Sequence, residues 1–86
     1  MEKADLIETK LTGTNLSDAV LTDADLSSAD LKGANLSSAD LSGADLRETD
    51  LTGADLSGAI LIDVNLTGAD LTDAKLEGAD LSGADL

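Results

Sequence analysis

The chain has 86 residues and a net charge of −13, and it contains no histidine, cysteine, proline or aromatic residue. This composition excludes disulfide bonds and thiol chemistry, removes most catalytic nucleophiles and proton shuttles, and opposes direct binding to the phosphates of nucleic acids. The length is that of one domain, which we expect to span residues 1–86.

The first ten residues, MEKADLIETK, lack the basic start and the apolar core of a secretory signal. Further along the chain, no apolar run is long enough to span a membrane. The sequence therefore predicts a soluble protein that makes no membrane contact and is cytoplasmic by default.

Leucine stands at every fifth position from Leu6 to Leu86, and Met1 is in the same register. In an α-helix five residues turn through about 500°, so successive leucines would spread around the helix instead of forming a stripe. In a straight strand the odd spacing would send successive leucines to opposite faces. The period therefore excludes both a regular helix and a long flat strand.

Very short strands joined by bends agree with this period. A small apolar residue, usually alanine, precedes each leucine by two positions, as in Ala24 and Leu26, and both side chains point the same way in an extended segment. After most leucines come Ser or Thr and then Gly, Asp, Ser or Glu, which favour turns. A chain that bends after every such strand directs all its leucines toward one axis.

The A-(D/N)-L-x-x signature resembles that of the pentapeptide-repeat family over essentially the whole chain. The resemblance implies an all-β fold, a right-handed quadrilateral parallel β-helix with four pentapeptides per coil. The chain would then form about four coils at the inter-strand spacing of about 4.8 Å, as a rod roughly 20 Å long without dedicated terminal caps.

The leucines of the inner coils form the predicted structural core, which consists of Leu26, Leu31, Leu36, Leu41, Leu46, Leu51, Leu56 and Leu61. Alanine beside them is small enough to leave them room. In four repeats the alanine is replaced, by Thr9, Thr14, Thr49 and Val64. An inward hydroxyl needs a hydrogen-bond partner, and we expect that partner to be a neighbouring backbone carbonyl.

Most of the negative charge falls on two adjacent faces of the expected coil, those centred on Leu6 and Leu21. The candidate acidic face consists of Asp5, Glu8, Asp25, Asp45, Glu48 and Asp85 around Leu6, and of Asp23, Asp40, Asp63 and Asp80 around Leu21. The aspartates and asparagines before the leucines are also expected to hydrogen-bond along the stack. The charge is either a solvated surface that keeps a repeat protein in solution or a site that binds a partner.

The resemblance gives the second alternative a specific form. Quinolone-resistance members of the family resemble DNA and bind bacterial type II topoisomerases, and stacked carboxylates approach the charge density of duplex DNA, about one charge per 1.7 Å. Those members are longer, commonly carry phenylalanine where this chain has leucine, and act as dimers. The sequence therefore predicts a non-enzymatic structural or protein-interaction module with an unknown protein partner. The alternative is an acidic DNA mimic that binds a DNA-binding protein such as gyrase.

Outward apolar residues are few, and Val20, Ile60 and Ile62 form a candidate apolar contact on the Leu21 face. No catalytic residue, cofactor or metal site is expected. Carboxylate pairs recur all along the surface without an obvious pocket, and the segment TDADLSSAD lacks the terminal glutamate of a calcium-binding loop.

The chain begins and ends in register with its repeats, at Met1 and Leu86. Solenoids need polar caps at their ends, so three alternatives stay open: a piece of a longer protein, an engineered chain, or ends covered by association. Among these, a fragment and an end-to-end homodimer between like ends are favoured, because head-to-tail stacking would grow a fibre.

Overall fold

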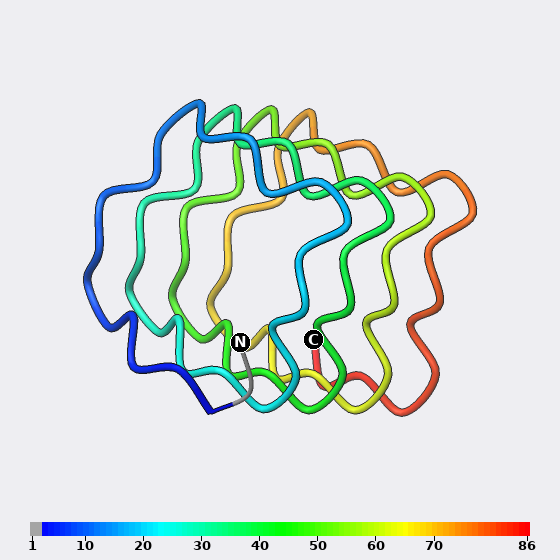
Figure 1. Ribbon diagram of the computed structural model, residues 1–86. Helices are drawn as coiled ribbons and strands as arrows, with labels where there is room; N and C mark the ends of the chain where they lie inside the picture. Colours follow the sequence, from blue (N-terminus) through cyan, green and yellow to red (C-terminus); the bar gives the residue numbers. More distant parts are fainter. Residues whose placement is uncertain (1–2) are drawn as a thin grey trace.

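The computed structural model describes residues 3–86, which wind into a stack of square coils (Figure 1). Backbone pairing between coils is parallel and is confined to the residue before each leucine, so that Asp5 pairs with Asp25 and Asp25 pairs with Asp45. The same pairing continues through the stack to Asn65 and Asp85. Residues 3–86 contain neither a helix nor a longer strand. The fold is the right-handed quadrilateral parallel β-helix that the resemblance implies.

Each side of the square ends in a tight turn over the two residues that follow the leucine. In the first of these turns, Thr9 N donates to Leu6 O at 3.2 Å, and Glu8 has a φ of 59°. A positive φ at the third residue is the pattern of a type II turn, in which glycine meets least steric resistance. All eight glycines of the chain occupy this position, and in the other repeats it is held by Asp, Ser, Glu or Lys.

Backbone hydrogen bonds join each coil to the next. Leu26 N donates to Asp45 O at 2.8 Å, while Asp45 N donates back to Ala24 O at 2.9 Å. Within the turn, Ser27 N donates to the Asp25 carboxylate at 3.1 Å. Nearly every backbone N–H of an inner repeat thus has a partner, as the interior of a folded protein requires.

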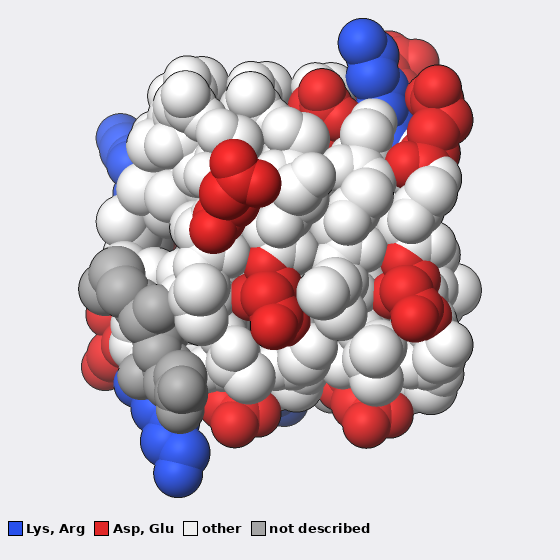
Figure 2. Space-filling view, turned by 45° about the vertical axis from the view of Figure 1, so that its right-hand side comes forward, with Lys and Arg blue, Asp and Glu red and all other residues white. Residues whose placement is uncertain are grey.

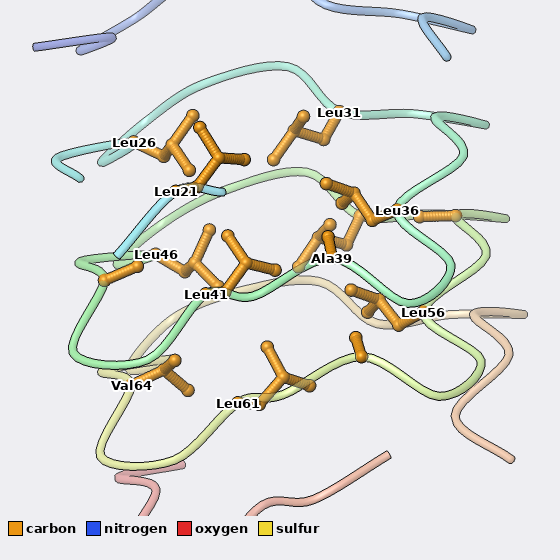
Figure 3. Close-up of a cluster of buried hydrophobic side chains, with 14 of the residues drawn as sticks. Leu21, Leu26, Leu31, Leu36, Ala39, Leu41, Leu46, Leu56, Leu61 and Val64 are labelled. Atoms are coloured by element: carbon orange, nitrogen blue, oxygen red, sulfur yellow. The ribbon is translucent and has the colours of Figure 1, made fainter. Parts of the chain in front are cut away.

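The core is one cluster of leucines that come from all four sides of the square, with alanines beside them. Figure 3 shows the leucine side chains pointing inward from successive coils. The eight leucines named as the structural core are at most 1% exposed, and the burial of each contributes about 1.5–3 kcal/mol. The Thr49 hydroxyl is also buried, and it donates to Leu46 O at 2.8 Å, which is the carbonyl partner expected for an inward threonine.

Burial decreases toward both ends of the stack. Leu6, Leu11 and Leu16 are half-buried in the first coil, and Leu86 in the last coil is 75% exposed. The stack measures 25 × 25 × 23 Å, so it is a short block about as long as it is wide, and its dimensions agree with the expected length of roughly 20 Å. No helix in residues 3–86 is long and apolar enough to cross a membrane.

Candidate interaction surface

The Leu6 side carries one column of carboxylates along the stack. Asp5, Asp25, Asp45 and Asp85 occupy the same position in successive coils, with Asn65 between the last two. Parallel pairing places neighbouring members of this column about 4.8 Å apart. The structure therefore brings together these four predicted site residues, with one uncharged interruption.

The Leu21 side alternates apolar and acidic residues. Its column runs from Val20 to Asp40, Ile60 and Asp80. Val20 is 50% exposed and Ile60 is 37% exposed, whereas Ile62, on the same side, is half-buried. Figure 2 shows this kind of spacing on one face of the molecule, where carboxylates are separated by uncharged side chains. The negative charge is thus spread over the surface and is not concentrated in a single cluster.

The remaining acidic residues of the candidate face lie at the corners of the square. Glu8, Asp23, Glu48 and Asp63 all occupy the positive-φ position of a turn. Asp23 and Asp63 stand where the chain passes from the Leu21 side to the Leu6 side, so they connect the two halves of the candidate acidic face. Their carboxylates lie against the glycines of the next coil, at Gly43 and Gly83.

Most aspartates of the columns bind the turn that follows them. The Asp40 carboxylate accepts from Ser42 Oγ at 2.7 Å and from Ser42 N at 3.0 Å. The bond from the Ser42 hydroxyl is the main reason that the pKa of Asp40 is lowered from its ordinary value, and the bond from Ser42 N contributes as well. Ser82 lowers the pKa of Asp80 in the same way. Contacts along the stack also occur, as expected: Asp50 forms an ion pair with Lys32 of the preceding coil at 3.8 Å, and a hydrogen bond from Thr52 helps to lower the pKa of Asp70. The nearest donors lie two residues ahead in the same turn, where the geometry of a short side chain favours them.

One base sits in the middle of the Leu6 side. Arg47 Nε donates to the Asp45 carboxylate at 2.8 Å, and the two groups form an ion pair. The hydrogen bond from Arg47 is the main reason that the pKa of Asp45 is lowered, and Asp45 in turn raises the pKa of Arg47. The position of Arg47 directly after Leu46 places it on this side, but the sequence pattern does not predict that it pairs with Asp45 rather than with Asp25 or Glu48.

The surface of residues 3–86 can contact a partner, but it does not enclose a ligand or a metal ion. Residues 3–86 enclose no pocket. In the same part of the chain, no group of three or more carboxylates is arranged to hold a metal ion. What the geometry provides is a pair of flat acidic sides with a few aliphatic side chains between the charges.

Comparison with known proteins identifies this architecture. The family model for pentapeptide repeats, which contains eight copies of the repeat, matches residues 1–37, 14–53, 29–68 and 49–86. The pentapeptide repeat protein Rfr23 from the cyanobacterium Cyanothece 51142 has a similar structure, with a TM-score of 0.97 and 34% identity over 99% of this chain and 58% of that chain. A pentapeptide repeat protein from Nostoc PCC 7120 is similar with a TM-score of 0.86 and 48% identity, over 87% of this chain and 62% of that chain.

A more distant structure shares the fold alone. QnrB1, a plasmid-mediated fluoroquinolone resistance protein, is similar with a TM-score of 0.56 and 19% identity over 96% of this chain. No curated protein sequence matches the chain. The chain spans 58% and 62% of the two cyanobacterial proteins. On the family match and these similarities, the chain belongs to the pentapeptide-repeat family.

Proposed function

We propose that this chain is a non-enzymatic structural or protein-interaction module whose candidate acidic face binds a protein partner. The observation that carries the proposal is the distribution of charge, since the columns and corners of two adjacent sides hold most of the net charge of −13. Such a surface attracts a basic partner and strengthens its encounter at low salt. Family membership supplies the fold, whereas the partner depends on the surface.

Capture on the immobilised chain tests this proposal. The acidic-side variant is Asp5→Asn, Asp25→Asn and Asp45→Asn, and each asparagine keeps an oxygen for the turn, as Asn35 does for Ser37 N at 3.0 Å. The opposite-side control removes three carboxylates at the same turn position on the Leu11 side, which faces the Leu21 side and lies outside the two acidic sides, with D30N, D50N and D70N. We expect the immobilised wild type and the control to retain proteins from a bacterial lysate. The acidic-side variant should no longer retain these proteins. Equal retention by both variants would show that the charge is only a solvated surface.

A second candidate function is mimicry of DNA toward a DNA-binding protein such as a bacterial type II topoisomerase. The regular axial spacing of the carboxylate columns favours it, because phosphates on a DNA duplex present a similarly regular array of negative charge. The Asp45–Arg47 ion pair reduces that charge at the centre of the Leu6 side. The mimic would therefore rely on the other carboxylates of this column, such as Asp5 and Asp25, together with the corner carboxylates and Asp40 and Asp80.

Supercoiling by DNA gyrase at two salt concentrations tests the second candidate. Mimicry would be supported if the wild type and the opposite-side control inhibit supercoiling. Inhibition should then be weaker at high salt, and weaker with the acidic-side variant than with the wild type. A folded chain that leaves supercoiling unchanged would exclude it for this enzyme and would leave the interaction module in place.

The ends of the stack support one further element of the proposal. Leu86 is 75% exposed and the leucines of both end coils are half-buried, so association of copies through their ends would cover apolar surface. We therefore include an end-to-end homodimer in the proposal.

A further inference from the structure

On the Leu21 side, the positions directly before and after the leucines combine aliphatic and acidic side chains. Val20, Asp40, Ile60 and Asp80 follow one another in the column before the leucines, and Ile62 lies beside Ile60 in the same repeat. Among residues 3–86, each of the other three sides carries at least one base at these positions, namely Arg47, Lys75, or Lys10 and Lys32. The Leu21 side carries none at these positions, so it is the side best suited to a basic and partly apolar partner.

The aliphatic part of this side is the pair Ile60 and Ile62, on either side of a buried leucine. Repeat 59–63 is the only repeat with an aliphatic residue at both positions. Ile60 is 37% exposed, and Ile62 is half-buried. In most repeats an aspartate or asparagine accepts from the backbone N–H two residues later, as Asp40 does from Ser42 N at 3.0 Å, and Ile60 cannot do so. The pair is thus an apolar patch that the turn itself does not require.

Two carboxylates, each fixed by its own turn, flank this pair along the stack. Asp40 lies one coil before Ile60 and Asp80 lies one coil after it, so the two positions are about 10 Å apart. Each carboxylate is held through one oxygen, Oδ1, which accepts from the N–H and the hydroxyl of Ser42 or Ser82. The hydroxyl bonds are also the main reason that the pKa of each carboxyl is lowered, so both are charged at neutral pH. The other oxygen of each carboxylate remains able to accept from a cation.

We propose that the Leu21 side binds a basic amphipathic α-helix of a protein partner, which lies along the stack with apolar residues over Ile60 and Ile62. A lysine or arginine one turn before these residues then reaches Asp40, and another one turn after them reaches Asp80. This inference rests on the acidic interaction face proposed above, and it adds the kind of partner and the side that the partner contacts.

The spacing of the coils suits a helix. One helical turn rises about 5.4 Å, and one coil of the stack rises about 4.8 Å. Two basic residues seven positions apart in a helix are separated by about 10.5 Å, which is close to the separation of about 10 Å between the positions of Asp40 and Asp80. Apolar residues three and four positions after the first base lie next to each other across the helix, as Ile60 and Ile62 do across the side.

Two other occupants fit this side less well. In an extended segment along the stack, side chains on one face repeat about every 6.7 Å, so three of them in a row span about 13 Å. A second copy that docked through the same side would bring the same two carboxylates and a net charge of −13 to a surface that has no base at these positions. The charge therefore favours a basic partner over a second copy.

Binding of a dye-labelled synthetic peptide, measured by fluorescence anisotropy at low ionic strength, tests this arrangement. The probe peptide has a lysine, two leucines three and four positions later, and a second lysine seven positions after the first, within about 16 residues that are otherwise alanine and glutamine. We expect the wild type to bind it, and I60S/I62S and D40N/D80N each to bind it about tenfold or more weakly. D30N/D70N is the matched control and should bind like the wild type. It removes two carboxylates at the same turn position, two coils apart, on the opposite side.

Altered peptides test the helix and its apolar contact without any change to the protein. One peptide has the same composition with one lysine moved to the opposite face of the helix, and another has glutamine in place of both leucines. Each should bind the wild type about tenfold or more weakly than the probe does. Because residues 3–86 contain no helix, a gain of helical circular dichroism on mixing reports the bound peptide. Binding without that gain, or equal binding of the altered peptides, overturns the amphipathic helix.

The outcomes separate this inference from the proposed function. If I60S/I62S binds the probe as tightly as the wild type does, the aliphatic pair is not the contact and the inference is overturned. If the wild type does not bind the probe but the capture experiment shows retention that depends on the acidic side, the interaction face stands and its helical partner is wrong. Self-association of the wild type that I60S/I62S loses, measured by sedimentation velocity, would show that a second copy covers the pair and would also overturn the inference. Thermal unfolding of each variant confirms that it is folded.

Discussion

At the scale of single residues, the aspartate or asparagine before each leucine holds the following turn in place. Asn35 accepts from Ser37 N at 3.0 Å and from Ser37 Oγ at 2.7 Å, with the same geometry as Asp40 and Ser42. The turn thus requires an oxygen at this position and not a charge. Aspartate adds a titratable group to that role, and its bound turn stabilises the ionised form.

Acid should weaken the fold through these residues. The pKa values of Asp40, Asp70 and Asp80 are lowered, chiefly by the hydroxyls of Ser42, Thr72 and Ser82. A lowered folded pKa means that the stabilisation is complete above the unfolded value of about 3.9 and is lost as the pH falls through the folded value. We expect the free energy of unfolding to fall below about pH 4 for this reason.

A triple variant, D40N/D70N/D80N, isolates the effect. It keeps the turn oxygens but cannot titrate, so its unfolding free energy should depend less steeply on pH below about pH 4 than that of the wild type. The control D18N/D23N/D73N removes equal charge at the corner positions, which no side-chain hydroxyl binds. If both triple variants flatten the profile equally, general charge repulsion and not the bound turns sets the acid dependence. Urea unfolding at several pH values measures the pH dependence of the unfolding free energy for the wild type and both triple variants.

Two glycines with nearly the same backbone conformation differ in the space above them. Gly33 and Gly43 have φ values of 64° and 70°, but only at Gly43 does the carboxylate of Asp23 occupy the place of an added Cβ. Gly33→Ala should cost about 1 kcal/mol from the positive φ. Gly43→Ala should cost roughly 0.5–1.5 kcal/mol more, because Asp23 must leave its rotamer.

The double variant D23A/G43A separates crowding from backbone strain. Without the Asp23 carboxylate, the cost of Gly43→Ala should fall to that of Gly33→Ala, as a double-mutant cycle in urea would show. An unchanged cost in the Asp23→Ala background would mean that the carboxylate does not occupy the site.

At the scale of the coil, burial separates inner repeats from end repeats. Leu41 is 0% exposed, whereas Leu81, two coils further in the same column, is half-buried. Leu41→Ala should therefore destabilise the chain by about 2–5 kcal/mol, and Leu81→Ala by about 1–2 kcal/mol. Urea unfolding compares the two, and an equal cost would show that the end coil is covered in solution. If a second copy covers the end coil, the cost of Leu81→Ala should fall when the comparison is repeated at low protein concentration.

The repeat explains which features the sequence predicts and which it does not. The period of leucine and the small residue two positions earlier, as in Ala24 and Leu26, predict which side chains point inward and hence the core. The four-sided coil was expected from the family resemblance. The partners of the polar side chains do not follow. Asp25 has neighbours both along the stack and along the chain, and the turn geometry brings Ser27 N within 3.1 Å of its carboxylate.

The candidate acidic face shows the same limit. Counting residues per side assigns Asp23 and Asp63 to the Leu21 side, but the turn places them at the corner that both sides share. The apolar Val20 and Ile60 fall into one column with Asp40 and Asp80, as the twenty-residue period requires. Position in a column is thus predictable, whereas the direction of a corner side chain is not.

At the scale of the whole molecule, the sides of the stack and its end coils expose different kinds of surface. The sides of the stack carry the candidate acidic face, and the end coils carry half-buried leucines. A partner on the sides and a second copy at the ends therefore do not compete for the same residues. A basic partner on the sides would also reduce the repulsion between stacked copies, each of which carries a net charge of −13.

Hydrogen exchange of the chain, alone and bound to the partner retained in the capture experiment, tests the central claim most directly. Each coil divides into an acidic half, residues 20–28 and 40–48, and an opposite half, residues 30–38 and 50–58, which peptides of this length resolve by mass spectrometry. We predict slower exchange on binding in 20–28 and 40–48 and unchanged exchange in 30–38 and 50–58. Protection confined to 30–38 and 50–58 would contradict the account, because the partner would then contact the sides that carry less of the charge.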